Sequence, residues 1–156
     1  MVEALYLQTV LAVMPEDDPL WRELTRCKRQ LDCRRITGED VLGGNFRIRR
    51  TQLALVAGTL EHMDKHVGGQ VLARLRDLYC TVLYVLVPMG DRWSRLVSRW
   101  ENQELIAYGL RPARQYSVTG KPLYLYQYDI YDYKLTPDWL NSKYWANPHR
   151  WDKKRW

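Results

Sequence analysis

The chain has 156 residues, of which 46% are hydrophobic and 27% charged, and this balance is typical of a globular domain rather than a disordered chain. A net charge of +6 excludes a strongly acidic protein and suits contact with acidic protein, RNA or anionic lipid heads. Three cysteines lack the spacing of a disulfide framework or a zinc knuckle, so we expect reduced thiols. Seven Trp and eleven Tyr against one Phe favour rings with a polar end, as at interfaces.

The N-terminal segment MVEALYLQTVLAVM (1–14) is apolar but short. It lacks the basic start and the small-residue cleavage site of a signal peptide. The longest apolar run, Cys80 to Met89, has about half of the ~20 residues that a membrane span needs. We therefore predict no transmembrane helix.

Four stretches carry apolar residues at helical spacing. The first begins at Pro19 with Asp18 as its N-cap, and we expect it to end near Arg35. The others follow in chain order, over 46–63, 71–86 and 91–106, and are separated by glycines and Pro88. Together they predict an all-α fold, a small helical bundle over residues 1–112.

The last segment, residues 113–156, differs from the bundle. Its stretch LYLYQYDIYDYKLTPDW (123–139) alternates with the period of a strand, but the phase of its tyrosines changes at Asp129-Ile130. Because we recognise no second strand-like segment, we predict an extended Tyr/Trp-rich tail that lies as a strap across the bundle and onto a partner chain. The rings and the turn predicted to bind the partner are Tyr126, Tyr128, Tyr131, Pro137, Trp139, Trp145 and Trp151.

Candidate catalytic chemistry is sparse. His62 and His66 are four residues apart, a spacing that can point two imidazoles at one zinc ion on a helix. A third ligand is not evident, and a solvated helix face is the better interpretation. We find no Gly-rich dinucleotide turn, no Gly-x-Ser-x-Gly elbow and no Cys/His nucleophile pair. The sequence therefore predicts no catalytic residues, no metal site and no enzyme.

The C-terminal third contains a series of aromatic and proline positions: Tyr108 and Pro112, then Tyr128-Asp129-Ile130-Tyr131, then Pro137-Asp138-Trp139, then Trp145 and Pro148. This series resembles the LYR-motif accessory subunits of the membrane arm of mitochondrial respiratory complex I. The Leu-Tyr-Arg tripeptide of that family is replaced by Leu5-Tyr6-Leu7 or Leu78-Tyr79-Cys80, neither of which carries the cation.

The resemblance implies a non-catalytic structural accessory subunit on the matrix side of the mitochondrial inner membrane, attached to the membrane through neighbouring protein subunits. In that family a helical bundle grips an acyl carrier protein. Here the bundle would start near Phe46, residues 1–44 would be an added N-terminal helical hairpin, and Arg47, Arg49 and Arg50 would contact the carrier. The implied cofactor is none of its own, only an acyl-phosphopantetheine held by the acyl carrier protein.

Two other classes remain open from the sequence. A basic RNA-binding protein of a mitochondrial ribosome would suit the charge of +6 and the pI near 9.3. A zinc enzyme that uses His62 and His66 is the third class.

Overall fold

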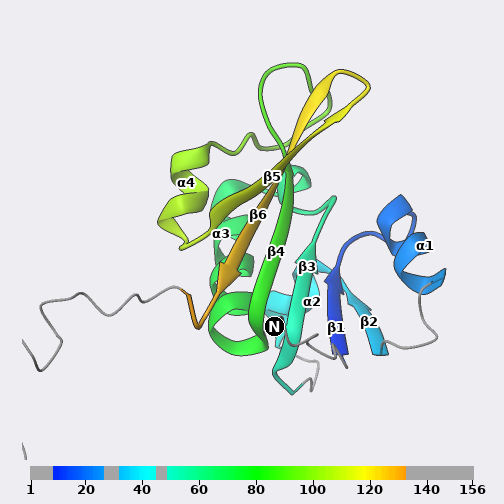
Figure 1. Ribbon diagram of the computed structural model, residues 1–156, viewed down its shortest axis with the longest axis vertical. Coiled ribbons are helices and arrows are strands. Elements are labelled where there is room, and N and C mark those ends of the chain that lie inside the picture. Colours follow the sequence, from blue (N-terminus) through cyan, green and yellow to red (C-terminus); the bar gives the residue numbers. More distant parts are fainter. Residues whose placement is uncertain (1–8, 27–31, 45–48, 133–156) are drawn as a thin grey trace, which may run out of the picture.

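The computed structural model describes residues 9–26, 32–44 and 49–132. These residues form a six-stranded sheet with helices on both faces, shown in Figure 1. The strands are β1 (Thr9–Val13), β2 (Asp32–Ile36), β3 (Thr51–Val56), β4 (Cys80–Pro88), β5 (Arg111–Val118) and β6 (Lys121–Asp129). The helices are α1 (Pro19–Arg26), α2 (Gly38–Gly43), α3 (Lys65–Arg74) and α4 (Asn102–Ala107), with a 3-10 turn η1 (Leu60–His62) and a π-helical turn η2 (Leu75–Tyr79).

The strand order is β2-β1-β3-β4-β6-β5. The first four strands of the chain run parallel, whereas β6 is antiparallel to both β4 and β5. Parallel neighbours need crossover connections, and the helices and turns between the strands supply them. The carboxyl ends of β1, β2 and β3 therefore lie along one edge of the sheet.

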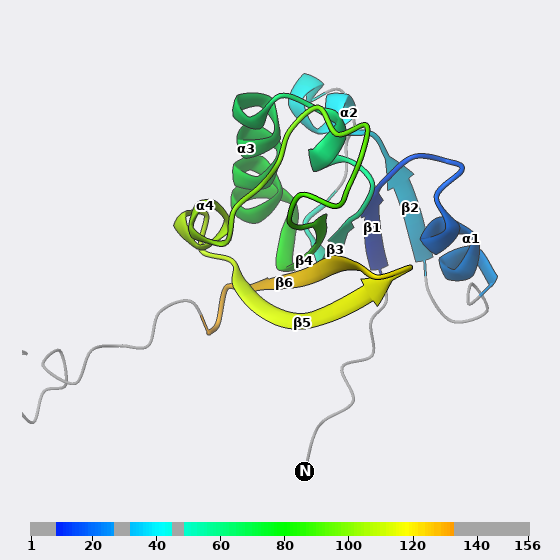
Figure 2. The same ribbon diagram turned by 90° about the horizontal axis from the view of Figure 1, so that it is seen from above.

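The helices divide the core between the two faces of the sheet. In Figure 2, α2, α3 and α4 lie on one side and α1 lies on the other, beside β1 and β2. The larger cluster of buried residues includes Leu11, Val56 and Val85 with Leu72 and Leu75. On the α1 side a smaller cluster of Ala12, Met14 and Ala57 packs with Leu20, Trp21 and Leu24.

The prediction of an all-α bundle is wrong. Residues 80–88 (CTVLYVLVP) and 51–56 form central strands, not helices. Strands covered on both faces read as continuous apolar runs, which periodicity alone does not separate from a buried helix. The β-branched residues Thr81, Val82, Val85 and Val87 favour the strand.

The prediction that the aromatic ribbon has no strand to pair with is also wrong. Residues 121–129 form β6, which pairs with β4 on one side and β5 on the other. β5 spans the predicted boundary at 112/113, so the sheet takes strands from both predicted segments. The phase change at Asp129-Ile130 marks the end of β6, where Asp129 Oδ1 accepts a hydrogen bond from the Tyr131 amide at 2.9 Å.

Three smaller expectations concern the first helix, the cysteines and a membrane-spanning helix. The first helix begins at Pro19 as predicted, and Asp18 Oδ1 accepts a hydrogen bond from the Leu20 amide at 2.8 Å, but the helix ends at Arg26 because β2 follows. Cys33 and Cys80 form no disulfide. None of the described helices is long and apolar enough to cross a membrane.

Candidate functional site

The carboxyl edge of β1, β2 and β3 holds a pocket of about 450 Å³. Three turns meet there because the strands are parallel, and the carboxyl edge is where open α/β sheets bind ligands. The lining residues are Met14 and Pro15 after β1, Thr37 to Glu39 after β2, Gly58, Thr59, His62 and Met63 after β3, and Val67 of α3. Most of this lining is apolar, and its ionisable side chains are Glu39 and His62.

The turn after β1 is acidic and short. It reads Pro15-Glu16-Asp17-Asp18-Pro19, with three carboxylates and no glycine. Its amides are partly used within the turn, because the Asp18 amide donates to the Pro15 carbonyl at 3.3 Å. A phosphate would meet negative charge here and too few free N–H groups.

The turn after β2 starts α2 with a capping box. Thr37 Oγ1 accepts a hydrogen bond from the Asp40 amide at 3.2 Å, and Asp40 Oδ2 accepts one from the Thr37 amide at 2.8 Å. The hydrogen bond from the Thr37 amide is the largest cause that lowers the pKa of Asp40. Asp40 is thus committed to the cap, and Glu39 is left as the exposed carboxylate that faces the pocket.

The segment after β3 contains a buried acid. Glu61 is only 8% exposed, and its Oε2 atom has no hydrogen-bond partner. Burial raises the pKa of Glu61, and the nearby carboxylate of Asp18 raises it further. Backbone hydrogen bonds from Glu61 and Thr59 and the charge of His62 act in the opposite direction, so the carboxylate as a whole is partly satisfied although its Oε2 atom is not.

The loop from Met89 to Trp100 fixes the backbone of this segment. The carbonyl oxygen of Glu61 accepts hydrogen bonds from the amides of Val97 at 2.8 Å and Ser98 at 3.2 Å. The Leu60 carbonyl accepts one from Ser98 Oγ at 2.9 Å and one from Trp100 Nε1 at 3.3 Å. Residues far apart in the sequence thus hold the turn after β3 in one position.

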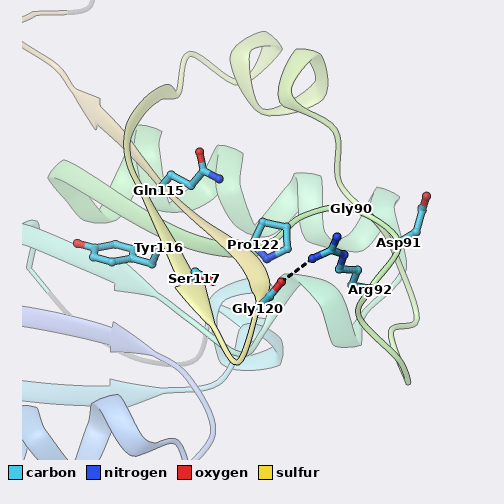
Figure 3. A pocket seen from close by; sticks show the side chains of 8 residues that line it. All are labelled: Gly90, Asp91, Arg92, Gln115, Tyr116, Ser117, Gly120 and Pro122. Atoms are coloured by element: carbon cyan, nitrogen blue, oxygen red, sulfur yellow. Dashed lines mark hydrogen bonds between the residues drawn. The ribbon is translucent and has the colours of Figure 1, made fainter.

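A second hollow of about 310 Å³ lies at the start of the same loop, against the β5–β6 hairpin (Figure 3). Arg92 donates a hydrogen bond to the Gly120 carbonyl at 3.0 Å, shown as a dashed line in Figure 3. Trp93 Nε1 donates to the Pro122 carbonyl at 2.8 Å. The register of Pro88 with Leu123 brings the hairpin turn to the carboxyl end of β4, so both hollows lie on the same edge of the sheet.

The predicted partner-binding residues fall into three groups. Tyr126 is fully buried and Tyr128 is 6% exposed, both in the core of this chain, whereas Tyr131 is 85% exposed. Pro137, Trp139, Trp145 and Trp151 lie outside the described residues, as does Arg47. Arg49 and Arg50 are exposed, and Arg50 Nε donates to the Cys80 carbonyl at 3.1 Å, beside the first residues of β3 and β4.

The two histidines do not share a helix. His62 ends η1 and lines the pocket at the carboxyl edge of β1, β2 and β3, whereas Met63, with extended backbone at φ −126°, separates it from α3. His66 lies in the first turn of α3, 3.1 Å from Gln70 Nε2. Among the residues that the structure describes, no group of three or more His, Cys, Asp or Glu side chains could hold a metal ion.

A model of a family of unknown function, DUF6231, matches residues 1–156. The chain belongs to this family. No curated protein matches the DUF6231 chain. Among solved structures, its fold is similar to that of S-adenosylmethionine-dependent methyltransferases, all at low sequence identity.

Three of these structures show the extent of the similarity. A 1,6-didemethyltoxoflavin-N1-methyltransferase of Burkholderia thailandensis, with S-adenosylhomocysteine bound, has a TM-score of 0.51 and 16% identity over 76% of this chain and 69% of its own. The mitomycin 7-O-methyltransferase MmcR has a TM-score of 0.57 and 13% identity over 79% of this chain and 49% of its own. A SAM-dependent methyltransferase of Aquifex aeolicus has a TM-score of 0.53 and 15% identity over 77% of this chain and 81% of its own.

These findings correct the functional expectations. The resemblance to LYR-motif subunits of complex I is wrong, because that family is a helical bundle and the DUF6231 chain is an α/β sheet. A non-catalytic subunit of a mitochondrial respiratory assembly, and the alternative of a mitochondrial ribosomal protein, are contradicted by a fold shared with methyltransferases. The structures at this level of identity show the fold alone, and the activity has to be argued from the site.

The site residues that the sequence analysis missed are Glu39, Gly58 and Glu61. All three follow strands at one edge of the sheet. The available signal was a short apolar run, 53–57, followed directly by Gly58 and by the polar residues Thr59, Glu61 and His62. Such a run bounded by glycine is consistent with a buried strand that ends at a ligand site.

Proposed function

We propose that this chain is an enzyme that binds S-adenosylmethionine at the carboxyl edge of β1, β2 and β3 and uses it to methylate an acceptor. The observation that carries the proposal is the pocket of about 450 Å³ at that edge. Its volume is in the range of small-molecule sites, and its position is where α/β sheets bind ligands. The similarity of the fold to methyltransferases supports it.

The residues of the pocket fit an adenosyl group. The apolar side chains of Met14, Met63 and Val67 can cover the faces of a purine ring. The capping box uses the carboxylate of Asp40 and not that of Glu39. The exposed carboxylate of Glu39 can therefore accept hydrogen bonds from ribose hydroxyls.

The negative charge of the turn after β1 favours this cofactor over the dinucleotides that other open α/β sheets bind. A pyrophosphate needs glycines and free amides at the first turn, whereas here Glu16, Asp17 and Asp18 carry negative charge. A cation suits the same place, because the turn after β1 is acidic and the lining carboxylate of Glu39 is exposed. S-adenosylmethionine carries positive charge on its sulfur and on its amine.

When bound, S-adenosylmethionine supplies a methyl group on a positively charged sulfur, which an acceptor nucleophile takes to leave S-adenosylhomocysteine. The chain's own contribution is positioning and proton removal. We assign His62, whose imidazole lines the pocket, to accept a proton from the acceptor. We place the acceptor along the loop from Met89 to Trp100, which joins the pocket edge to the hollow of Figure 3.

Titration calorimetry with S-adenosylmethionine and S-adenosylhomocysteine tests the proposal. We expect one site per chain, weakened about tenfold or more in Glu39→Ala, since a hydrogen-bonding carboxylate is lost. Glu23→Ala is the matched control, because Glu23 lies on α1 and pairs only with Arg26 among the described ion pairs. Absence of binding of either compound at millimolar concentration would overturn the proposal.

A further inference from the structure

The hollow against the β5–β6 hairpin differs in charge from the pocket at the carboxyl edge of β1, β2 and β3. The two segments that form it, residues 90–99 and 111–122, contain one acidic residue, Asp91, and six basic ones: Arg92, Arg95, Arg99, Arg111, Arg114 and Lys121. The turn after β1, at the other pocket, holds three acidic residues and no basic one. An anion is therefore attracted to this hollow and repelled from the other pocket.

Two of these arginines are fixed by backbone carbonyls on the two sides of the hollow. Arg92, which lines it, donates from Nη1 to the Gly120 carbonyl of the hairpin at 3.0 Å. Arg99 donates from Nη1 to the Gly90 carbonyl of the loop at 2.9 Å. Gly90 and Gly120 both line the hollow. A carbonyl orients a guanidinium without neutralising it, so both positive charges stay in place beside the hollow.

The cations beside the hollow are not neutralised by the described carboxylates. Among the ion pairs that the described residues form, none includes Arg92, Arg99 or Lys121. Lys121 Nζ instead lies 5.4 Å from the centre of the Trp93 ring. Asp91 is an acidic lining residue, but in Figure 3 its side chain points away from the other labelled side chains. The positive charge is thus left for a ligand.

Neutral hydrogen-bond donors complete the lining of the hollow. Gln115 and Ser117 both line it, and neither side chain forms a hydrogen bond with another described residue. They are two residues apart on β5 and therefore project from the same face of that strand. Arg92 uses a single N–H group on Gly120, which leaves further donors of its guanidinium for a ligand. A guanidinium beside an amide and a hydroxyl matches an oxyanion, which accepts several hydrogen bonds.

We infer that this hollow binds an oxyanion group, a phosphate or a carboxylate, of the molecule that accepts the methyl group. A volume of about 310 Å³ suits a small acceptor. The positively charged methyl donor then lies on the acidic side of the sheet edge and the anionic acceptor on its basic side. The role as acceptor site rests on the proposed function, whereas the binding of an anion does not.

NMR titration of the full chain with inorganic phosphate, and separately with acetate, tests the inference. The ionic strength is held constant with sodium chloride, because salt screens exposed charges. The backbone amide signals of Gly90, Ser117 and Gly120 report on the hollow. We expect these signals to shift saturably, and the anion that binds more tightly identifies the group on the acceptor. No saturable shift with either anion would overturn the inference.

Arg92→Gln tests the lining cation. Loss of its charge-assisted hydrogen bonds should weaken anion binding about tenfold or more. Arg26→Gln is the matched control, because it changes the net charge equally but lies on α1, beside β1 and β2 (Figure 2). Arg26 pairs with Glu23, and its loss should leave anion affinity unchanged. Equal losses in the two variants would mean that only net charge acts, and the inference would be wrong.

Ser117→Ala keeps the test independent of the hairpin anchor that Arg92 also provides. The substitution breaks no hydrogen bond to a described residue. Loss of one hydroxyl donor should weaken anion binding about threefold, while the amide signals outside the hollow stay unchanged. If Ser117→Ala bound the anion as tightly as the wild type, the anion would not lie in the hollow, and the inference would be overturned.

The anion titration and the calorimetry with S-adenosylmethionine fail independently. Binding of S-adenosylmethionine without binding of either anion would overturn the inference and leave the proposed function standing. Binding of an anion without binding of S-adenosylmethionine would overturn the proposed function and the acceptor role together.

Discussion

The Oδ2 atom of Asp18 lies 2.7 Å from the position that a Cβ atom at Gly58 would occupy. Pro15 Cδ lies 3.3 Å from the same position, and the backbone of Gly58 is left-handed, with φ +56°. The turn after β1 therefore packs directly on the turn after β3. Both turns line the carboxyl-edge pocket, so the contact joins two parts of its wall.

Gly58→Ala should destabilise the fold and weaken ligand binding. Left-handed backbone costs an alanine about 1–2 kcal/mol, and the new methyl group must displace Asp18 or Pro15. We expect the free energy of unfolding to fall by more than that backbone cost alone, as measured by urea titration.

Gly120→Ala is the matched control for this effect. Gly120 is also left-handed, with φ +75°, but nothing lies within 4 Å of its Cβ position. It should therefore show the backbone cost without the clash. If both variants lost the same free energy of unfolding, the close approach of Asp18 to Gly58 would contribute nothing to the effect.

Glu61→Gln should change how stability depends on pH. Burial raises the folded-state pKa of Glu61 above its ordinary value of 4.5, so the folded state binds the proton more tightly than the unfolded state. The contribution of Glu61 to stability is thus fully present below 4.5 and is lost as the pH rises through the raised pKa, because the carboxylate ionises in a buried place.

The glutamine variant lacks this loss. We expect it to be at least as stable as the wild type at pH 7 without ligand, with the difference vanishing near pH 4. Urea titrations at both pH values measure it. The opposite result would be a glutamine variant that matches the wild type at pH 4 but is less stable than the wild type at pH 7. It would show that the charge of Glu61 is satisfied in the folded protein.

Local signals in the sequence were reliable where one residue acts on its neighbours. Asp18 and Pro19 predicted the start of α1, and the tyrosine alternation predicted an extended strand-like segment where β6 lies. These features depend on hydrogen bonds within a few residues and on a strand with two different faces.

The central strands were missed because their burial is a property of the whole fold. In β4 the side chains of Leu83, Val85 and Val87 face α3 and its neighbours, while Tyr84 and Leu86 lie half-buried on the other face. Such a strand has no polar face to reveal its period. Gly68 and Gly69 were interpreted as a break between two helices, but both lie inside α3. Trp100 and Tyr108 approach them too closely for a side chain.

The site was missed for a related reason. Glu39, Gly58 and Glu61 are dispersed along the chain, and they meet only because parallel strands bring their carboxyl ends to one edge. Without the strands, the acids of this site read as solvated charge.

Cys80 should be inert toward thiol reagents in the folded protein. It is fully buried at the start of β4, its Sγ donates to the Leu75 carbonyl at 3.1 Å, and burial raises its pKa to about 12. Reaction needs the thiolate, which is scarce at neutral pH. Iodoacetamide labelling with peptide mapping should modify the half-buried Cys33 first and Cys80 only after denaturation. Labelling of Cys80 at the same rate as Cys33 would contradict its burial.

Tyr126 should matter for the stability of the isolated chain. Its ring is fully buried in the main core, and its hydroxyl donates a hydrogen bond to Asn102 Oδ1 at 2.9 Å, which joins β6 to α4. Tyr126→Phe removes the hydrogen bond and should cost about 1 kcal/mol. Tyr126→Ala also leaves a cavity and should cost about 3–5 kcal/mol.

Tyr131→Ala is the control, because it removes an exposed ring rather than one packed in the core of this chain. Tyr131 is 85% exposed just beyond the end of β6, so its removal should leave the melting temperature of the isolated chain unchanged. Thermal melts of the three variants measure the difference. If Tyr126→Ala melted like the wild type, the ring would not be packed inside this chain, and its place in β6 between β4 and β5 would be wrong.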